Sequence, residues 1–138
     1  MPPTVAFQGA PGAFGESAAL RWRPDARALP CPTFDAARER AARGEAEAAA
    51  LPVENRIAGP VAEARAALGA RVAVLRVDAE VTEPVALCLL ALPGAAEGAL
   101  RAARSHPVAL AQCGAFLAAR PALAPEPWWD TAGAARDV

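Results

Sequence analysis

Short apolar runs alternate with segments of helical composition along the first half of the chain, and this alternation constrains the fold more than any other feature. The predicted elements are strands at residues 4–7 and 48–51 and helices at residues 13–22, 34–43 and 61–68. A short apolar piece, Ala28-Leu29, lies in the connection between the first two helices. Strands that alternate with helices favour a largely parallel sheet. The sequence therefore predicts an α/β lobe.

Three polar side chains follow the second of these apolar runs, which reads as a buried strand. They are the carboxylate of Glu54, the amide of Asn55 and the guanidinium of Arg56. Pro60 then suits the first turn of the helix expected over residues 61–68, because its φ is already helical. Open α/β sheets bind ligands at the carboxyl ends of strands, next to helix N-termini. We therefore expect this polar stretch to line a ligand site.

A glycine-containing turn, residues 8–12, joins the first strand to the first helix. A strand, a glycine turn and a helix in this order are typical of a loop whose free backbone amides hold an anion. The glycine spacing is neither that of a Walker loop nor that of a dinucleotide fingerprint. The turn therefore predicts anion binding and argues against nucleotide binding.

The second half of the chain contains the most apolar run, residues 85–92, which predicts a buried strand that ends at Pro93-Gly94. The other expected elements are a strand at 71–81, a short helix at 95–103, a loop or short strand at 121–127 and a helix at 132–138 preceded by the N-cap pair Asp130-Thr131.

A second polar landmark begins at Ser105. Either Ser105 or His106 can cap a helix there, and Pro107 is tolerated in its first turn. Gln112 lies seven residues past Ser105, which is two turns along the same side of a helix. One interpretation places both side chains against one ligand. The other is an ordinary capped helix with a surface glutamine, and the residues alone leave both open.

Composition narrows the class of protein. The net charge of −1 provides no basic field for nucleic acid or an anionic membrane. The three cysteines, Cys31, Cys88 and Cys113, have neither metal nor redox spacing, and with a single histidine they predict no metal site. No signal peptide and no apolar run long enough for a membrane span is present. We expect a soluble, cytoplasmic protein without a cofactor.

Five motifs, in order along the chain, resemble those of the prephenate dehydratase family, which includes the arogenate dehydratases of plants. Phe7-Gln8-Gly9-Ala10-Pro11-Gly12-Ala13-Phe14 is similar to the family's F-Q-G-x-P-G-A-Y, and Leu51-Pro52-Val53-Glu54-Asn55 to its L-P-I/V-E-N. The remaining three matches lie at residues 88–94 (C-L-L-A-L-P-G), 105–113 (S-H-P-Q-A-L-A-Q-C with Val108 different) and 130–135 (D-T-A-G-A-A). The resemblance covers the whole length of the chain.

The resemblance implies an α/β fold of two lobes, similar to type II periplasmic binding proteins, with the substrate between the lobes. Residues 1–75 would form the first lobe. Residues 76–138 would begin a second lobe that is incomplete at its C-terminus. The family further implies a homodimer or a homotetramer.

The implied reaction converts prephenate to phenylpyruvate with loss of carbon dioxide and water, in the biosynthesis of L-phenylalanine. Aromatisation of the ring supplies the driving force, so the enzyme mainly orients the substrate and protonates the departing hydroxyl. By matching position, Glu54 is the catalytic candidate. The substrate-binding candidates are Ala13, Phe14, Asn55, Arg56, Ser105, Gln112 and Thr131.

The chain departs from the family pattern in two ways. The late T-R-F/D motif, whose threonine is the family's acid, is absent, which predicts that these 138 residues are a fragment and inactive alone. Gly15, Arg56 and Leu87 stand where the family usually has Ser, Ser or Thr, and His. Arg56 could replace a lost hydroxyl by a bidentate contact to a carboxylate. The alternatives are a non-catalytic binding module of the same fold, an arogenate dehydratase and a prephenate decarboxylase.

Overall fold

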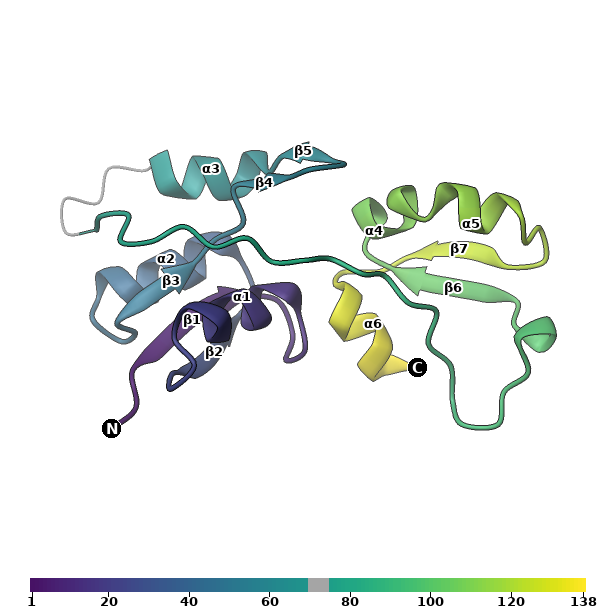
Figure 1. Cartoon of the computed structure of the whole chain (residues 1–138), viewed down its shortest axis with the longest axis horizontal. Coiled ribbons are helices and arrows are strands. Elements are labelled where there is room, and N and C mark those ends of the chain that lie inside the picture. Colours follow the sequence, from purple (N-terminus) through teal and green to yellow (C-terminus); the bar gives the residue numbers. More distant parts are fainter. Residues whose placement is uncertain (70–74) are drawn as a thin grey trace. The chain divides into compact units, whose positions relative to one another are not determined.

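A computed structural model describes residues 1–69 and 75–138, and the chain divides into two compact units, Met1–Pro84 and Val85–Val138. Each unit contains strands and helices, and parallel pairing dominates in both (Figure 1). The predicted α/β class is confirmed. The expected boundary between lobes at residue 75 stays a prediction.

The first unit is built on a three-stranded parallel sheet in the order β2-β1-β3. Its strands are β1 (Thr4–Gln8), β2 (Arg27–Cys31) and β3 (Ala48–Ala50), and its helices are α1 (Phe14–Trp22), α2 (Phe34–Ala42) and α3 (Ala62–Gly69). The short apolar piece expected between the first two helices is thus the centre of a full strand. The strand and helix predictions for residues 1–69 are confirmed, with α3 starting one residue later than expected.

The core of the first unit is made largely of small side chains around β1. Phe7 and Val5 are its largest fully buried residues, and the helices contribute Ala19 from α1 and Ala37 from α2. Alanine faces let helices approach a sheet closely, because no long side chain separates the backbones. Cys31 at the end of β2 is buried in the same core, and burial raises the pKa of its thiol.

β3 is less buried than predicted. Its three alanines are all only partly covered, whereas β1 is buried at its centre. The reason is position, since β3 pairs with β1 on one side and is an edge strand of this sheet. The apolar run at 48–51 indicated the strand correctly but not its place at the edge.

Local signals account for both ends of α2. The Thr33 hydroxyl oxygen accepts a hydrogen bond from the backbone N–H of Ala36 at 3.0 Å, which satisfies a free amide of the first turn. Beyond the other end, Gly44 has a φ of +72°, the left-handed conformation that glycine adopts without strain. The predicted glycine stop is confirmed.

The second unit contains a two-stranded parallel sheet of β6 (Ala102–Ser105) and β7 (Ala124–Pro127). Its helices are α4 (Pro107–Gln112), α5 (Gly114–Ala118), α6 (Thr131–Asp137) and the 3₁₀ turn η1 (Glu97–Ala99). The helix predicted over 95–103 is wrong, because only η1 is helical and β6 has already begun at Ala102. The predicted helix at the end of the chain is confirmed.

The buried strand predicted at 85–92 is also wrong. This stretch has no regular structure, and its large apolar side chains are exposed, Leu90 and Leu92 at 66% and 63%. A strand requires a neighbour for its hydrogen bonds, and no strand in the described part of the chain pairs with this run. The strand predicted at 71–81 fails for residues 75–81, which have no regular structure, and residues 71–74 lie outside the described part.

Candidate functional site

Two of the predicted site segments leave the same edge of the first unit's sheet. β1 and β3 are parallel neighbours, with Phe7 opposite Ala50. The glycine turn therefore follows β1 at the edge from which the stretch carrying Glu54 follows β3. β2 ends there too, with Cys31 opposite Gln8. Carboxyl ends of parallel strands are where open sheets bind ligands, and this geometry agrees with the position predicted for the site.

The backbone amides of the glycine turn are less available than predicted. The N–H of Gly9 donates to the carbonyl of Cys31 at 3.0 Å, and that of Ala13 donates to Ala10 at 3.1 Å. The N–H of Gly12 donates to the carboxylate of Glu16 at 2.5 Å. These three N–H groups already donate hydrogen bonds to acceptors within the chain. The expectation of free amides is wrong for them, because two donate to backbone carbonyls and Glu16 on the first turn of α1 accepts from the third.

The candidate residues Ala13 and Phe14 lie at the start of α1. Ala13 occupies the N-cap position and has no side-chain oxygen to cap the helix. Phe14 is 36% exposed and is the first residue of the helix. An exposed aromatic ring beside the carboxyl edge of a sheet offers an apolar surface to a ring-shaped ligand.

The stretch with Glu54 and Asn55 forms a β-hairpin that the sequence did not indicate. β4 (Glu54–Asn55) pairs with β5 (Gly59–Pro60) in antiparallel register. The side-chain oxygen of Asn55 accepts hydrogen bonds from the N–H groups of Ile57 and Ala58, both at 2.9 Å. This oxygen closes the turn, as asparagine commonly does. Pro60 is consequently part of β5, and the prediction that it opens the helix is wrong.

Glu54 and Arg56 have different surroundings within this hairpin. The carboxylate of Glu54 pairs with Nη2 of Arg65 on α3 at 3.2 Å, and Nε of Arg65 donates to the carbonyl of Val53 at 2.9 Å. Arg56 is exposed and has no hydrogen-bond or ion-pair partner among residues 1–69 and 75–138. Glu54 is thus tied to a helix, while the guanidinium of Arg56 is exposed and has no partner within the described ranges.

In the second unit, Ser105 and Thr131 meet directly. Ser105 ends β6, Thr131 begins α6, and the Ser105 hydroxyl donates to Oγ1 of Thr131 at 3.1 Å. The parallel pairing of β6 with β7 brings them together, because both strands end at one edge with Ser105 opposite Pro127. The sequence predicted both residues for the site, and the structure adds that they form one pair.

The caps of the two helices that follow this edge are side chains of His106 and Asp130. Nδ1 of His106 accepts from the N–H of Val108 at 3.2 Å, so His106 rather than Ser105 caps α4. The carboxylate of Asp130, which is 8% exposed, accepts from the N–H of Gly133 at 2.8 Å and caps α6. Because His106 is the cap, the Ser105 hydroxyl remains for Thr131.

Gln112 lies apart from this pair along its helix. It is the last residue of α4, whose six residues make a helix about 9 Å long. It is partly buried and is engaged in an interaction of its own. The prediction that Gln112 and Ser105 share one ligand stays a prediction.

A cluster around two tryptophans was missed by the sequence reasoning. The indole N–H of Trp128 donates to Asp137 at 3.0 Å, and that of Trp129 donates to the same oxygen at 3.4 Å. The guanidinium of Arg104 lies 4.3 Å from the ring centre of Trp128. Hydrogen bonds from Arg136 and then Trp128 lower the pKa of the Asp137 carboxyl. The only signal was the aromatic pair itself, because the partner nine residues away belongs to the next helix.

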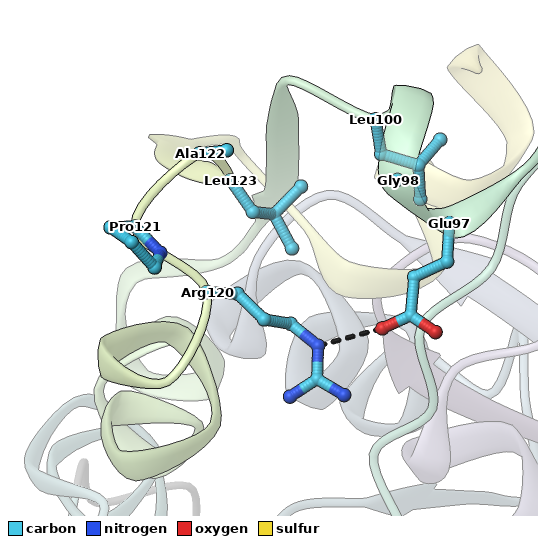
Figure 2. A pocket seen from close by; sticks show the side chains of 7 residues that line it. All are labelled: Glu97, Gly98, Leu100, Arg120, Pro121, Ala122 and Leu123. Carbon is cyan, nitrogen blue, oxygen red and sulfur yellow. Dashed lines mark hydrogen bonds and ion pairs between the residues drawn. The ribbon is translucent and has the colours of Figure 1, made fainter.

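A hollow lies at the opposite edge of the β6–β7 sheet, where the strands begin (Figure 2). It has a volume of about 340 Å³, and the ion pair between Arg120 and Glu97, at 2.7 Å, spans it. The guanidinium of Arg120 also lies 3.8 Å from the ring centre of Phe116. The carboxyl-edge rule did not predict this hollow, since it precedes both strands.

The described residues hold no group of three or more His, Cys, Asp or Glu side chains placed to bind a metal ion. Across residues 1–69 and 75–138 there is also no helix with the length and apolarity that a membrane crossing requires.

Comparison with known proteins shows which family the chain resembles. The family model described as prephenate dehydratase matches residues 5–138. Arogenate dehydratase 5, chloroplastic, of Arabidopsis thaliana is 41% identical over 135 residues, which is 97% of this chain and 31% of the plant protein. The chain thus spans about a third of that relative's length.

Two solved structures are also similar. One is described as GqqA, a novel type of quorum quenching acylases, with a TM-score of 0.81 and 38% identity over 94% of this chain and 46% of the other. The second is prephenate dehydratase in complex with L-Phe from Arthrobacter aurescens, with a TM-score of 0.71 and 30% identity over 96% of this chain and 44% of the other. A family match over nearly the whole chain, together with this agreement of fold, shows that the chain belongs to the prephenate dehydratase family.

Proposed function

We propose that this chain belongs to an enzyme that converts prephenate to phenylpyruvate, a carbon–oxygen lyase of L-phenylalanine biosynthesis. The observation that carries the proposal is the family match over residues 5–138. The two sheet edges support it, since each collects polar groups at the carboxyl ends of parallel strands.

Prephenate carries two carboxylates and a ring hydroxyl that must leave with a proton. The exposed guanidinium of Arg56 suits a bidentate contact to one carboxylate. In the other unit, the hydroxyls of Ser105 and Thr131 suit an anionic or hydroxyl group of a ligand, because the hydrogen bond between them fixes their orientation. Phe14 offers a face for the ring. We assign each of these residues a binding role within its own unit.

Glu54 fits an orienting role better than that of an acid. Its carboxylate accepts from Arg65, and an ion-paired carboxylate accepts hydrogen bonds rather than donating a proton. We assign Glu54 to accepting a hydrogen bond from the substrate hydroxyl. Asn55 acts mainly by closing the hairpin on which Glu54 and Arg56 lie.

Arogenate is the alternative substrate, and the relative from Arabidopsis thaliana carries the name arogenate dehydratase. Arogenate has an ammonium group where prephenate has a keto oxygen, and an ammonium binds best next to a carboxylate. The engagement of Glu54 by Arg65 leaves less negative charge for such a group. This favours prephenate.

The similarity to a quorum quenching acylase raises a second activity. An acylase with a hydroxyl nucleophile requires a base next to the hydroxyl. The Ser105 hydroxyl donates to another hydroxyl, and the adjacent His106 uses Nδ1 to cap α4. This arrangement supports the lyase over the acylase.

The proposal includes a homodimer or homotetramer in the cytoplasm that uses no cofactor. Light scattering during size-exclusion chromatography measures the mass of the assembly. A monomer of the full-length protein would contradict this part of the proposal.

The test is to mix full-length protein with prephenate and to follow the absorbance of phenylpyruvate, with arogenate in a parallel reaction. The proposal expects phenylpyruvate from prephenate. Prephenate that raises the melting temperature without forming product would replace the lyase by a non-catalytic binding module. Decarboxylation without dehydration would indicate a prephenate decarboxylase.

A further inference from the structure

The segment 75–84, which has no regular structure, is fastened to α1 by one carboxylate. Oε1 of Glu83 accepts from the hydroxyl of Ser17, and Oε2 accepts from Nε of Arg21, both at 2.6 Å. Ser17 and Arg21 lie four residues apart on α1 and therefore on one face of the helix. Each oxygen of the carboxylate thus has its own partner on a regular element.

This ion pair differs from the others in the described part of the chain by its shielding. The side chain of Glu83 is 15% exposed, whereas the carboxylates of the remaining ion pairs are between 27% and 67% exposed. Exposed pairs contribute little because water and salt screen them. Arg21 is 52% exposed, so only the carboxylate side of this pair is shielded from solvent.

The contact also joins distant parts of the sequence. Glu83 is separated from Ser17 by 66 residues and from Arg21 by 62. The first unit ends at Pro84, one residue beyond this carboxylate. The segment has neither helix nor strand, and the side chain of Glu83 joins it to α1 just before the first unit ends.

We propose that Glu83 is a latch that fastens segment 75–84 to α1 and releases it when the carboxylate is protonated. The latch connects the helix that begins with Phe14 to the segment that leads out of the first unit. This role is independent of the reaction that the protein catalyses.

The charged groups around the latch determine its response to pH. From α1, Ser17 and Arg21 face Glu83, and the hydrogen bond from Arg21 followed by that from Ser17 lowers the pKa of its carboxyl. Within the segment, Arg76 pairs with Asp78 at 3.1 Å, and Glu80 is the remaining acid. A carboxyl with a lowered folded pKa stabilises the folded contact above its unfolded pKa, about 4.3, and this contribution disappears as pH falls through the folded value.

The experiment is NMR on the full chain, with backbone order parameters at Thr82 and Glu83 as the readout. In the wild type these are expected near the rigid value of about 0.85, and in E83A they should fall below about 0.6. S17A removes one hydrogen bond and should lie between them. E80Q is the matched control in the same segment and should equal the wild type. Equal order parameters in the wild type and E83A would overturn the proposal.

A carboxyl titration followed by ¹³C shifts provides the second readout. The Glu83 midpoint should move to higher pH in R21A and in S17A, because each variant removes a hydrogen bond that lowers the pKa of this carboxyl. The order parameter of Thr82 should fall over the same pH range in which Glu83 titrates. A Glu83 midpoint that is the same in the wild type and R21A, or order that persists after Glu83 is protonated, would contradict the latch.

Discussion

Asn55 was predicted to bind the substrate. In the structure, its side chain closes a turn. Its side-chain oxygen holds the N–H groups of Ile57 and Ala58, both at 2.9 Å. Without it, those two amides lose their acceptor and the hairpin that carries Arg56 is less defined. A motif residue can therefore serve a site by shaping the backbone next to it.

We predict that N55A lowers the free energy of unfolding by about 1–2 kcal/mol, because two hydrogen bonds to one oxygen disappear. N55D retains an oxygen at the same position and should lose less. Urea denaturation followed by circular dichroism measures both. Equal stability of N55A and the wild type would show that the turn does not depend on this side chain.

Gly133 is a residue where even one methyl group has no room. A Cβ built there would lie 2.3 Å from Cζ2 of Trp129. Alanine is favoured over glycine inside helices by about 1 kcal/mol, but overpacking costs typically 1–3 kcal/mol. We predict that G133A destabilises the second unit by about 1–2 kcal/mol.

The matched control is G114A, because nothing lies within 4 Å of a Cβ built at Gly114 in α5. This variant should be neutral or slightly stabilising. Thermal unfolding monitored by tryptophan fluorescence compares the two. A G133A variant as stable as G114A would show that Trp129 moves aside at no cost.

At the scale of elements, the helices whose ends are marked by capping residues in the local sequence were predicted well. α2 has a threonine cap at Thr33 and a glycine after its last turn, and both signals act within a few residues. α6 likewise begins after the Asp130 cap. Such elements are visible in sequence because the groups that start and stop them are local.

The predictions that failed concern segments whose structure depends on partners distant in the sequence. Residues 85–92 have the apolarity of a strand, but pairing decides whether a strand forms, and no described strand lies beside them. Residues 102–105 form β6 because β7, about twenty residues later, pairs with them. The hairpin at Asn55 was missed because proline before a helical pattern usually indicates the first turn of the helix.

We predict that T33A lowers the stability of the first unit by about 1 kcal/mol, since the N–H of Ala36 loses its acceptor. T33S retains the hydroxyl and should stay near the wild type. Hydrogen exchange at the first-turn amides of α2 measures this locally, with faster exchange in T33A alone. Unchanged exchange would mean that the cap contributes nothing to the helix.

At the scale of the whole molecule, each of the two units has parallel strands with polar groups after their carboxyl ends. Two side-chain interactions could not be predicted from the sequence. The pairing of Ser105 with Thr131 needs the register of β6 and β7, and the ion pair of Glu54 needs the position of α3. Both depend on segments that are distant in sequence.

The most direct test of the account is phenylpyruvate formation from prephenate by the full-length protein, compared among the wild type, R56A and R43A. The bidentate contact assigned to Arg56 predicts that R56A lowers kcat/KM about 10- to 150-fold, equivalent to about 1.5–3 kcal/mol. Arg43 directly follows α2 and forms an exposed pair with Glu39, so R43A should match the wild type. No phenylpyruvate from the wild type would contradict the proposed reaction, and equal kcat/KM for R56A and R43A would contradict the site.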